Sequence, residues 1–345
     1  MQKKITKVTT DRQTVIDVLK GISVIFVIIT HYSWSEKQRM IGLFPFCVDM
    51  AVPIFMIVSG YVFTNSYLKK GIVCFENAYP MPLIIKRLLR YVIPFMMAYT
   101  IEIAWFFAFG DGLSGHDIVV NFFRGGIGPG SYYFPVLLQI TFFLPVILFS
   151  MYKRPAKGLL FWFAFNGFYE MIEMVIGLDS NVYRLSLFRY SFLIACGCFI
   201  YLQKGKEKIK RCILFSAFSI GFVFIFVTCY MGYETKIINN IWKGTSYMSA
   251  LYIAPIVMLI IYKFGKFSFK PLELVGKASF NIFLTQMVYY ASVSESVKKR
   301  SSSIFVHVTL NVVICVVFGV LFYFVESKFT NRIIHGVNRL IRADR

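Results

Sequence analysis

The feature that most constrains this chain is a series of about ten apolar runs, most of them long enough to cross a bilayer. A helix needs about 20 mainly apolar residues to span the hydrocarbon core of a membrane. Hydrophobic residues make up 57% of the chain, more than an ordinary soluble domain contains. We therefore expect an all-α fold, a polytopic transmembrane helical bundle. The runs cover residues 18–34, 45–65, 90–109, 132–151, 158–178, 184–202, 211–231, 246–263, 279–293 and 303–325.

The chain has a formal net charge of +20, and the positions of its basic residues account for this charge without a nucleic-acid partner. When loops are assigned alternately to the two sides of the membrane, one set holds most of the Lys and Arg residues. Such an excess is typical of cytoplasmic loops, which lie beside anionic lipid. Both termini are therefore predicted to be cytoplasmic, with the lipid bilayer as partner. The basic loops lie near 69–90, 153–157, 204–211 and 263–270, and in the tail from 328.

The connections between the apolar runs are short, so we expect a single integral membrane domain over residues 1–345. Its last part, 327–345, reads as a short basic cytoplasmic tail. The longest outer loop, near 110–131, is rich in glycine and favours tight turns or a flexible connector. Because no soluble catalytic domain is apparent, any chemistry must come from the helices and short loops.

The first apolar run contains three ionisable residues on one helical face. Lys20 and His31 are eleven residues apart, which at about 100° per residue brings them within roughly 20° of the same direction. Asp17 precedes Lys20 by three residues and joins this face. An ionisable side chain inside a membrane helix is costly unless it faces the bundle interior or a wet cavity. The aligned set therefore predicts a functional site, with a buried structural histidine as the alternative.

These residues, together with three later segments, resemble the motifs of the acyltransferase-3 family of integral membrane O-acyltransferases. The family signature begins with an Asp, a basic residue three positions later, and a His eleven positions after that. The basic position is usually Arg in the family and is Lys20 here, and Gln286 stands where relatives often carry His. The other similar segments are Val52–Tyr61, which contains Ser59-Gly60 and favours close helix packing, Arg87-Leu88-Leu89-Arg90, and Gly276–Gln286.

The resemblance implies a bacterial plasma-membrane enzyme that transfers an acyl group, most often acetyl, from cytoplasmic acetyl-CoA. The acceptor would be a hydroxyl of a surface polysaccharide or a lipid-linked glycan, and a separate extracytoplasmic partner could complete the transfer. His31 would act as general base or carry the acyl group, because a neutral imidazole can do either. Asp17 belongs to the same signature, and its alternative role is a structural ion pair with Lys20.

Further residues have candidate roles, each beside a simpler one. Arg87 and Arg90, with Lys20, suit the phosphates of acetyl-CoA, although such a cluster also anchors a helix at the cytoplasmic surface. Glu102 lies in the third run and could orient or activate His31. Tyr132 and Tyr133 start the fourth run, where they form an interfacial aromatic belt or stack on a sugar. No metal site is expected, and His116, His307 and His335 show no partner pattern.

Two other functions fit the same features. A proton-coupled transporter or flippase for a glycan or small polar solute also needs many spans and intramembrane ionisable residues. The absence of repeat symmetry in the sequence speaks against it. A non-catalytic membrane subunit that recruits an enzyme is the third possibility. A transporter would move solute without consuming acyl-CoA, and a scaffold would do neither.

Overall fold

The computed structural model describes residues 13–110, 112–205, 210–294 and 303–343, and within them all regular secondary structure is helical. This confirms the predicted all-α class for these residues. The helices are α1 (Thr14–Thr30), α2 (Glu36–Ile41), α3 (Ala51–Lys69), α4 (Met81–Phe109), α5 (Gly115–Arg124), α6 (Tyr133–Tyr152), α7 (Pro155–Ile176), α8 (Ser180–Leu185), α9 (Ser191–Leu202), α10 (Arg211–Phe224), α11 (Tyr247–Lys263), α12 (Lys270–Lys277), α13 (Ser279–Ser292) and α15 (Ile304–Ala343).

Each predicted apolar run overlaps a helix, and several of these helices have the length and composition of membrane spans. Six stretches of the described residues meet both conditions, and two shorter apolar helices accompany them. This pattern supports a multi-pass membrane protein, while the total of ten spans stays a prediction. The six stretches are Phe44–Lys69, Met81–Phe109, Tyr133–Tyr152, Pro155–Ile176, Arg211–Tyr230 and Ile304–Val337.

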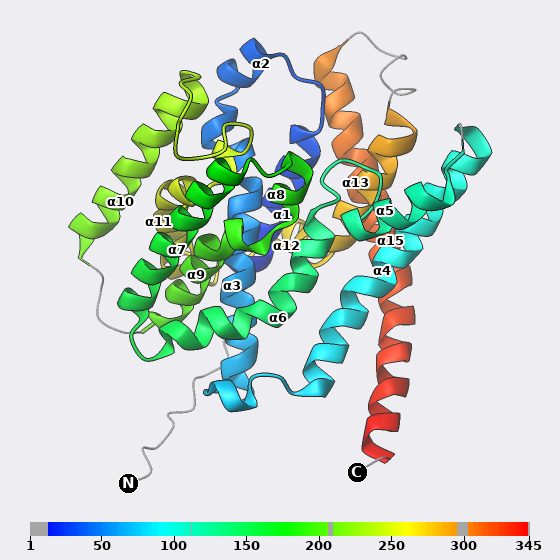
Figure 1. The fold of residues 1–345 in the computed structure, drawn as a ribbon. Coiled ribbons are helices and arrows are strands. Elements are labelled where there is room, and N and C mark those ends of the chain that lie inside the picture. The colour runs from blue at the N-terminus through cyan, green and yellow to red at the C-terminus, as the bar shows by residue number, and fades with distance from the viewer. Residues whose placement is uncertain (1–12, 111, 206–209, 295–302, 344–345) are drawn as a thin grey trace.

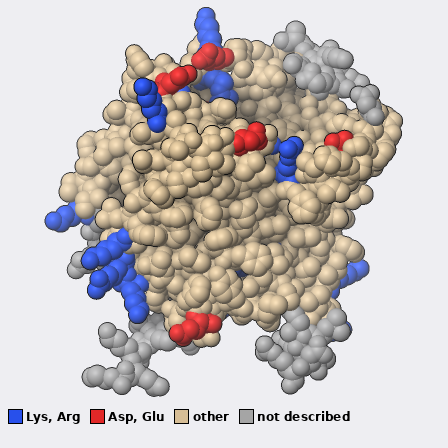
Figure 2. All heavy atoms as spheres, in the orientation of Figure 1, with Lys and Arg blue, Asp and Glu red and all other residues tan. Residues whose placement is uncertain are grey.

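The helices form one bundle with its charged groups toward the ends. Figure 1 shows α10 on one flank and α4 with α15 on the opposite flank. The C-terminal end of α15 lies at the same end of the bundle as the connection between α3 and α4. In the same orientation, Figure 2 shows a broad band of uncharged side chains across the middle, with Lys and Arg gathered above and below it. This distribution is what a bilayer around the middle of the bundle requires.

Glycines allow two helix pairs in the interior to approach closely. A Cβ atom at Gly60 of α3 would overlap the main chain of Ile194 in α9, which confirms the close packing predicted for Ser59-Gly60. In the second pair, α1 crosses α12. There a Cβ atom at Gly276 would overlap the carbonyl oxygen of Asp17. Main chains can come this near only where a side chain is absent.

The buried apolar side chains form two clusters, and α1 runs along both of them. The larger cluster draws on α3, α6, α9 and α11. The smaller cluster includes residues of α4, α13 and α15, together with the second half of α1. Tyr133, at the start of α6, packs against both clusters. The region where the two clusters meet is thus packed by residues of both clusters, and its geometry is therefore well fixed.

Three boundaries differ from the sequence-based expectation. The first run was expected to be helical over 18–34, but α1 ends at Thr30 because the indole of Trp34 donates to the carbonyl of Ile29 (2.7 Å) and so satisfies a helix-end acceptor. The glycine-rich loop near 110–131 contains the helix α5, which begins with a capping box between Ser114 and Asp117. The segment assigned to a separate tail, 327–345, continues α15 without a break as far as Ala343.

Candidate active site

His31 lies at the C-terminal end of α1 and not in the interior of a helix. Its main-chain N–H still bonds to the carbonyl of Ile28 (3.3 Å), while its φ and ψ of −84° and −3° turn the chain away from the helix axis. The imidazole is half-buried and meets the ring of Tyr290 edge-on, with 6.0 Å between the ring centres. A helix end exposes more of a side chain than a helix interior, so His31 is well placed to meet a substrate.

Asp17 and Lys20 pair with each other near the opposite end of α1. Their Oδ1 and Nζ atoms are 3.9 Å apart, and both side chains are largely buried. Lys20 precedes His31 by eleven residues, about 16 Å along a helix axis. The structure therefore places the acid and the base of the signature as an ion pair, about 16 Å from the histidine along the helix.

A glycine-rich loop, residues 125–131, lies directly against His31. A Cβ atom at Gly130 would lie only 3.2 Å from Nε2 of His31. Gly125, Gly126 and Gly130 have φ values of +89°, +120° and +84°, which side-chain-bearing residues rarely adopt. These glycines therefore let the main chain of the loop reach the imidazole.

Glu102 fixes this loop, and in the part of the chain that the structure describes its carboxylate contacts the loop and not His31. The carboxylate is buried and accepts hydrogen bonds from the N–H groups of Ile127 (3.0 Å) and Gly128 (3.2 Å). Gln286 holds the next residue of the loop, because its Nε2 donates to the carbonyl of Pro129 (2.9 Å). Glu102 and Gln286 are thus positioning residues for the wall beside His31.

A cavity of about 510 Å³ opens in front of His31 and brings three of the predicted residues together. Tyr132 and Tyr133 line it with His31. Its volume lies within the range of ligand pockets, about 300–1,000 Å³. The remaining wall is both aromatic and charged, and includes Trp242, Arg39, Asp49, Arg184 and Lys243.

Arg87 and Arg90 lie at the other end of the bundle, where α4 begins. The guanidinium of Arg87 is packed over the rings of Phe63 (4.4 Å) and Tyr67 (4.5 Å), and its Nη2 donates to Ser66 (3.2 Å). Its buried Nη1 has no hydrogen-bond partner among the described residues. A buried guanidinium with an unused donor is suited to an anion, because charged donors form strong bonds to phosphate.

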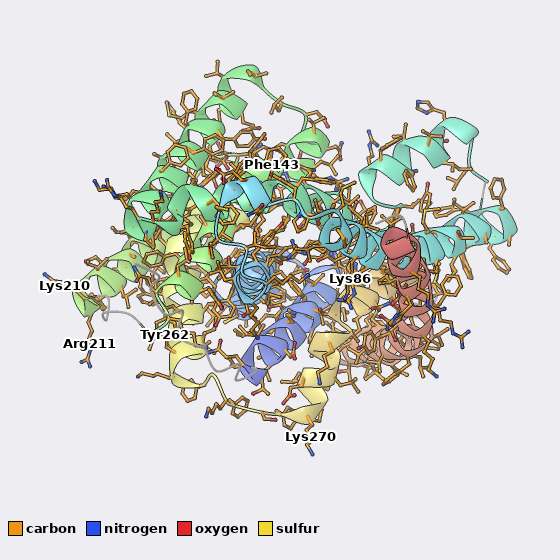
Figure 3. The ribbon with its side chains drawn as sticks, turned by 90° about the horizontal axis from the view of Figure 1, so that it is seen from below. Lys86, Phe143, Lys210, Arg211, Tyr262 and Lys270 are labelled. Atoms are coloured by element: carbon orange, nitrogen blue, oxygen red, sulfur yellow. The ribbon has the colours of Figure 1, made fainter. Side chains whose placement is uncertain are left out.

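Further cations surround Arg87 at this end. Arg90 is exposed. Lys70 is near enough to Arg87, Lys86 and Arg90 to be repelled by their positive charges. Partial burial, followed by the positive charges of Lys86 and the two arginines, lowers the pKa of Lys70 below its ordinary value. Figure 3 views the bundle from this end and shows Lys86 of α4, Lys210 just before α10 and Lys270 of α12 at separate places. An anion bound here would relieve the repulsion.

His307 is a residue that the sequence reasoning passed over. It lies in the first turn of α15, is 5% exposed, and neither ring nitrogen has a partner within the described residues. Its position inside a membrane-length apolar run was the signal that could have identified it. In the same described part of the chain, no group of three His, Cys, Asp or Glu residues is arranged to hold a metal ion.

Comparison with known proteins identifies a family for this chain. A family model described as an acyltransferase domain, the acyltransferase-3 model, matches residues 14–325. No curated protein and no solved structure matches the chain. The matched segment runs from the start of α1 into α15 and so contains every candidate residue described above.

Proposed function

Because the chain belongs to the acyltransferase-3 family and is a membrane acyltransferase by that membership, we propose that it transfers an acetyl group from acetyl-CoA to a hydroxyl group of a surface polysaccharide or lipid-linked glycan. The observation that carries this proposal is the position of His31. Its imidazole lies on the wall of a cavity of ligand size that Tyr132 and Tyr133 also line. A base beside aromatic faces is the arrangement that a sugar hydroxyl needs, since the rings can stack on the sugar while the imidazole removes the proton.

The donor is proposed to bind at the basic end of the bundle, which we take as cytoplasmic. Arg87 offers an unused buried N–H group, and Arg90 and Lys86 add positive charge beside it. Acetyl-CoA carries a pyrophosphate and a ribose phosphate, which suit such a cluster. Lys20, paired with Asp17, is proposed to lie along the path of the acyl arm toward His31.

The chemical step follows from these positions. His31 takes the proton of the acceptor hydroxyl, and the oxygen attacks the carbonyl carbon of the thioester. The carbon–sulfur bond then breaks, and the CoA sulfur receives the proton from His31, so that an ester and free CoA are formed. In the alternative route, the imidazole nitrogen attacks the thioester carbonyl, the carbon–sulfur bond breaks, and the released CoA sulfur takes the imidazole proton. The acceptor oxygen then displaces the imidazole from the acetyl group, and the imidazole keeps the proton of the hydroxyl. Both routes require His31, and both leave Glu102 the task of holding the glycine-rich loop in place.

A transfer assay in membranes tests the proposal. Membranes that contain the protein are incubated with acetyl-CoA labelled in its acetyl group, and alkali-labile label is counted in the glycan fraction. We expect His31→Ala to abolish the label, because general acid–base catalysis contributes about 10²–10⁴-fold and an acyl carrier is indispensable. His116→Ala is the matched control, since that side chain is 83% exposed on α5. Full transfer by His31→Ala would exclude the mechanism.

A further inference from the structure

A second, smaller cavity lies beside His31. Its volume is about 210 Å³, and it separates the end of α1 from α13 and the first turns of α15. The lining is polar for a site within an apolar bundle, with two imidazoles, two phenols, an amide and two hydroxyls. The residues that line it are His31, Tyr32, Ser33, Pro129, Tyr290, Ser294, His307 and Asn311.

His307 lines this cavity together with His31. Its ring lies 6.3 Å from that of Tyr32, centre to centre, and only 5% of the residue is exposed. Both ring nitrogens lack partners in the part of the chain that the structure describes. Because a buried polar atom without a partner is destabilising, these nitrogens need a bonding partner inside the cavity.

Two of the other polar side chains of the lining, Asn311 and Tyr290, already bond to each other. Asn311 accepts a hydrogen bond from the hydroxyl of Tyr289 and donates one to the hydroxyl of Tyr290 (3.2 Å). Tyr290 in turn donates to the carbonyl of Ile28 (2.9 Å) in the last turn of α1. This network fixes α13 and α15 against α1, whereas both ring nitrogens of His307 have no partner among the described residues.

Water fits both the size and the polarity of the cavity. A water molecule occupies about 30 Å³ in the liquid and needs two to four polar partners, so the cavity has room for several. The described lining residues include no Asp, Glu, Lys or Arg, and the titratable groups that line the cavity with His307 are His31, Tyr32 and Tyr290. A proton that enters this space is therefore held by an imidazole.

We propose that His307 is a positioning residue for His31, joined to it by water molecules in the small cavity, and that it shares the proton that His31 takes from the acceptor. The water chain fixes which ring nitrogen of His31 carries the hydrogen. The other ring nitrogen is then unprotonated and acts as the base toward the large cavity. The shared proton returns through His31 to the CoA sulfur, and no further reactant is needed. The catalytic part of this inference rests on the proposed function, whereas the link between the two rings does not.

Nuclear magnetic resonance of the imidazole nitrogens tests the link without any assay of activity. The chain has only four histidines, so ¹⁵N-histidine labelling in lipid nanodiscs gives few signals, each assigned by its own Gln variant. We expect His307→Gln to change the tautomer ratio of His31 and the midpoint of its titration. The matched control His335→Gln, which changes an exposed histidine of the same helix, should leave both unchanged. Unchanged His31 signals in His307→Gln would overturn the inference.

The transfer assay then separates positioning from a purely structural role. We expect His307→Phe to lower kcat about tenfold, with little change in KM and an altered pH profile, and His307→Gln to retain part of the rate by bonding to water. A fall in both variants that is explained by loss of folded protein, with an unchanged pH profile, would contradict the catalytic part. If wild-type protein transfers nothing but the nitrogen signals remain coupled, the proposed function fails and the link between the rings stands.

Discussion

Nε2 of His31 faces Gly130 so closely that a Cβ atom at this glycine would lie 3.2 Å from the nitrogen. The same Cβ atom would lie 3.2 Å from the ring of Phe283 on the other side. Gly130 therefore sets the distance between the loop and the base, and no larger residue fits without moving one of the two rings.

The first prediction concerns Gly130→Ala. The left-handed φ of +84° should cost an alanine about 1–2 kcal/mol of folding free energy, and the new methyl group should displace His31 and reduce transfer. Gly112→Ala is the matched control, because its φ is +75° but nothing lies within 4 Å of the added atom. We expect both variants to unfold at lower temperature and only Gly130→Ala to lose activity. Equal activity in the two would show that the loop does not position His31.

The second prediction separates two roles of Glu102. If it only holds the loop, Glu102→Ala should cost about 2–4 kcal/mol, since two buried N–H groups lose their acceptor. Glu102→Gln keeps one acceptor oxygen and should be intermediate in both stability and transfer. Thermal unfolding and the transfer assay measure the two effects, with the exposed Glu76→Gln as control. A stable Glu102→Gln variant without any activity would instead indicate that the charge acts on His31.

Much of the fold could be predicted because apolar runs of membrane length are a strong local signal. The end of α1 could not, since it depends on the indole of Trp34 folding back to Ile29. The helix α5 was missed although its capping signal, Ser114 with Asp117, is present, because its position inside a glycine-rich stretch suggested a loop. In both cases a specific polar contact overrides the composition of the segment.

The candidate site divides in the same way. His31 could be identified from its spacing to Lys20, because that spacing lies within a single helix. The role of Glu102 as support for the loop, and the burial of His307 in the wall of a cavity that His31 also lines, depend on three segments that are far apart in the sequence. The spacing of residues within one helix cannot predict how the glycine-rich loop and α15 pack against the end of α1.

The third prediction concerns the proposed donor site and its dependence on pH. The lowered pKa of Lys70 means that it loses its proton at lower pH than an ordinary lysine, whose value is 10.5. Bound acetyl-CoA would favour the protonated form, so donor affinity should fall as the pH rises toward 10.5, and it should fall sooner than for an unperturbed lysine. Calorimetric titration with acetyl-CoA from neutral to alkaline pH measures this.

Lys70→Met tests the assignment directly. Without the donor, this variant should be slightly more stable than the wild type, because it removes a cation that is repelled by its neighbours. Its affinity for acetyl-CoA should be lower and less dependent on pH. Lys153→Met, at another basic connection, is the control. The prediction is wrong if the two variants bind acetyl-CoA alike.

The fourth prediction concerns the charge of the acceptor. In the large cavity Arg39 is neutralised by Asp49 through two bonds of 2.7 and 2.8 Å, whereas Arg184 and Lys243 lie on the wall without such a carboxylate among the described residues. The buried Nε of Arg184 also has no partner there. An acceptor with a carboxylate or phosphate near the reacting hydroxyl should therefore bind better than a neutral one.

The matched acceptors are a uronic-acid oligosaccharide and the same oligosaccharide with its carboxylates reduced to alcohols. We expect a KM about three- to fivefold lower for the charged acceptor, the effect of an interaction worth about 0.7–1 kcal/mol. The double variant Arg184→Gln/Lys243→Gln should remove this preference and leave transfer to the reduced acceptor unchanged. Because reduction adds a primary hydroxyl to each uronic acid, transfer is compared at the ring hydroxyls that both acceptors share. A preference for the neutral acceptor, or one that survives in the double variant, would show that charge in this cavity does not select the substrate.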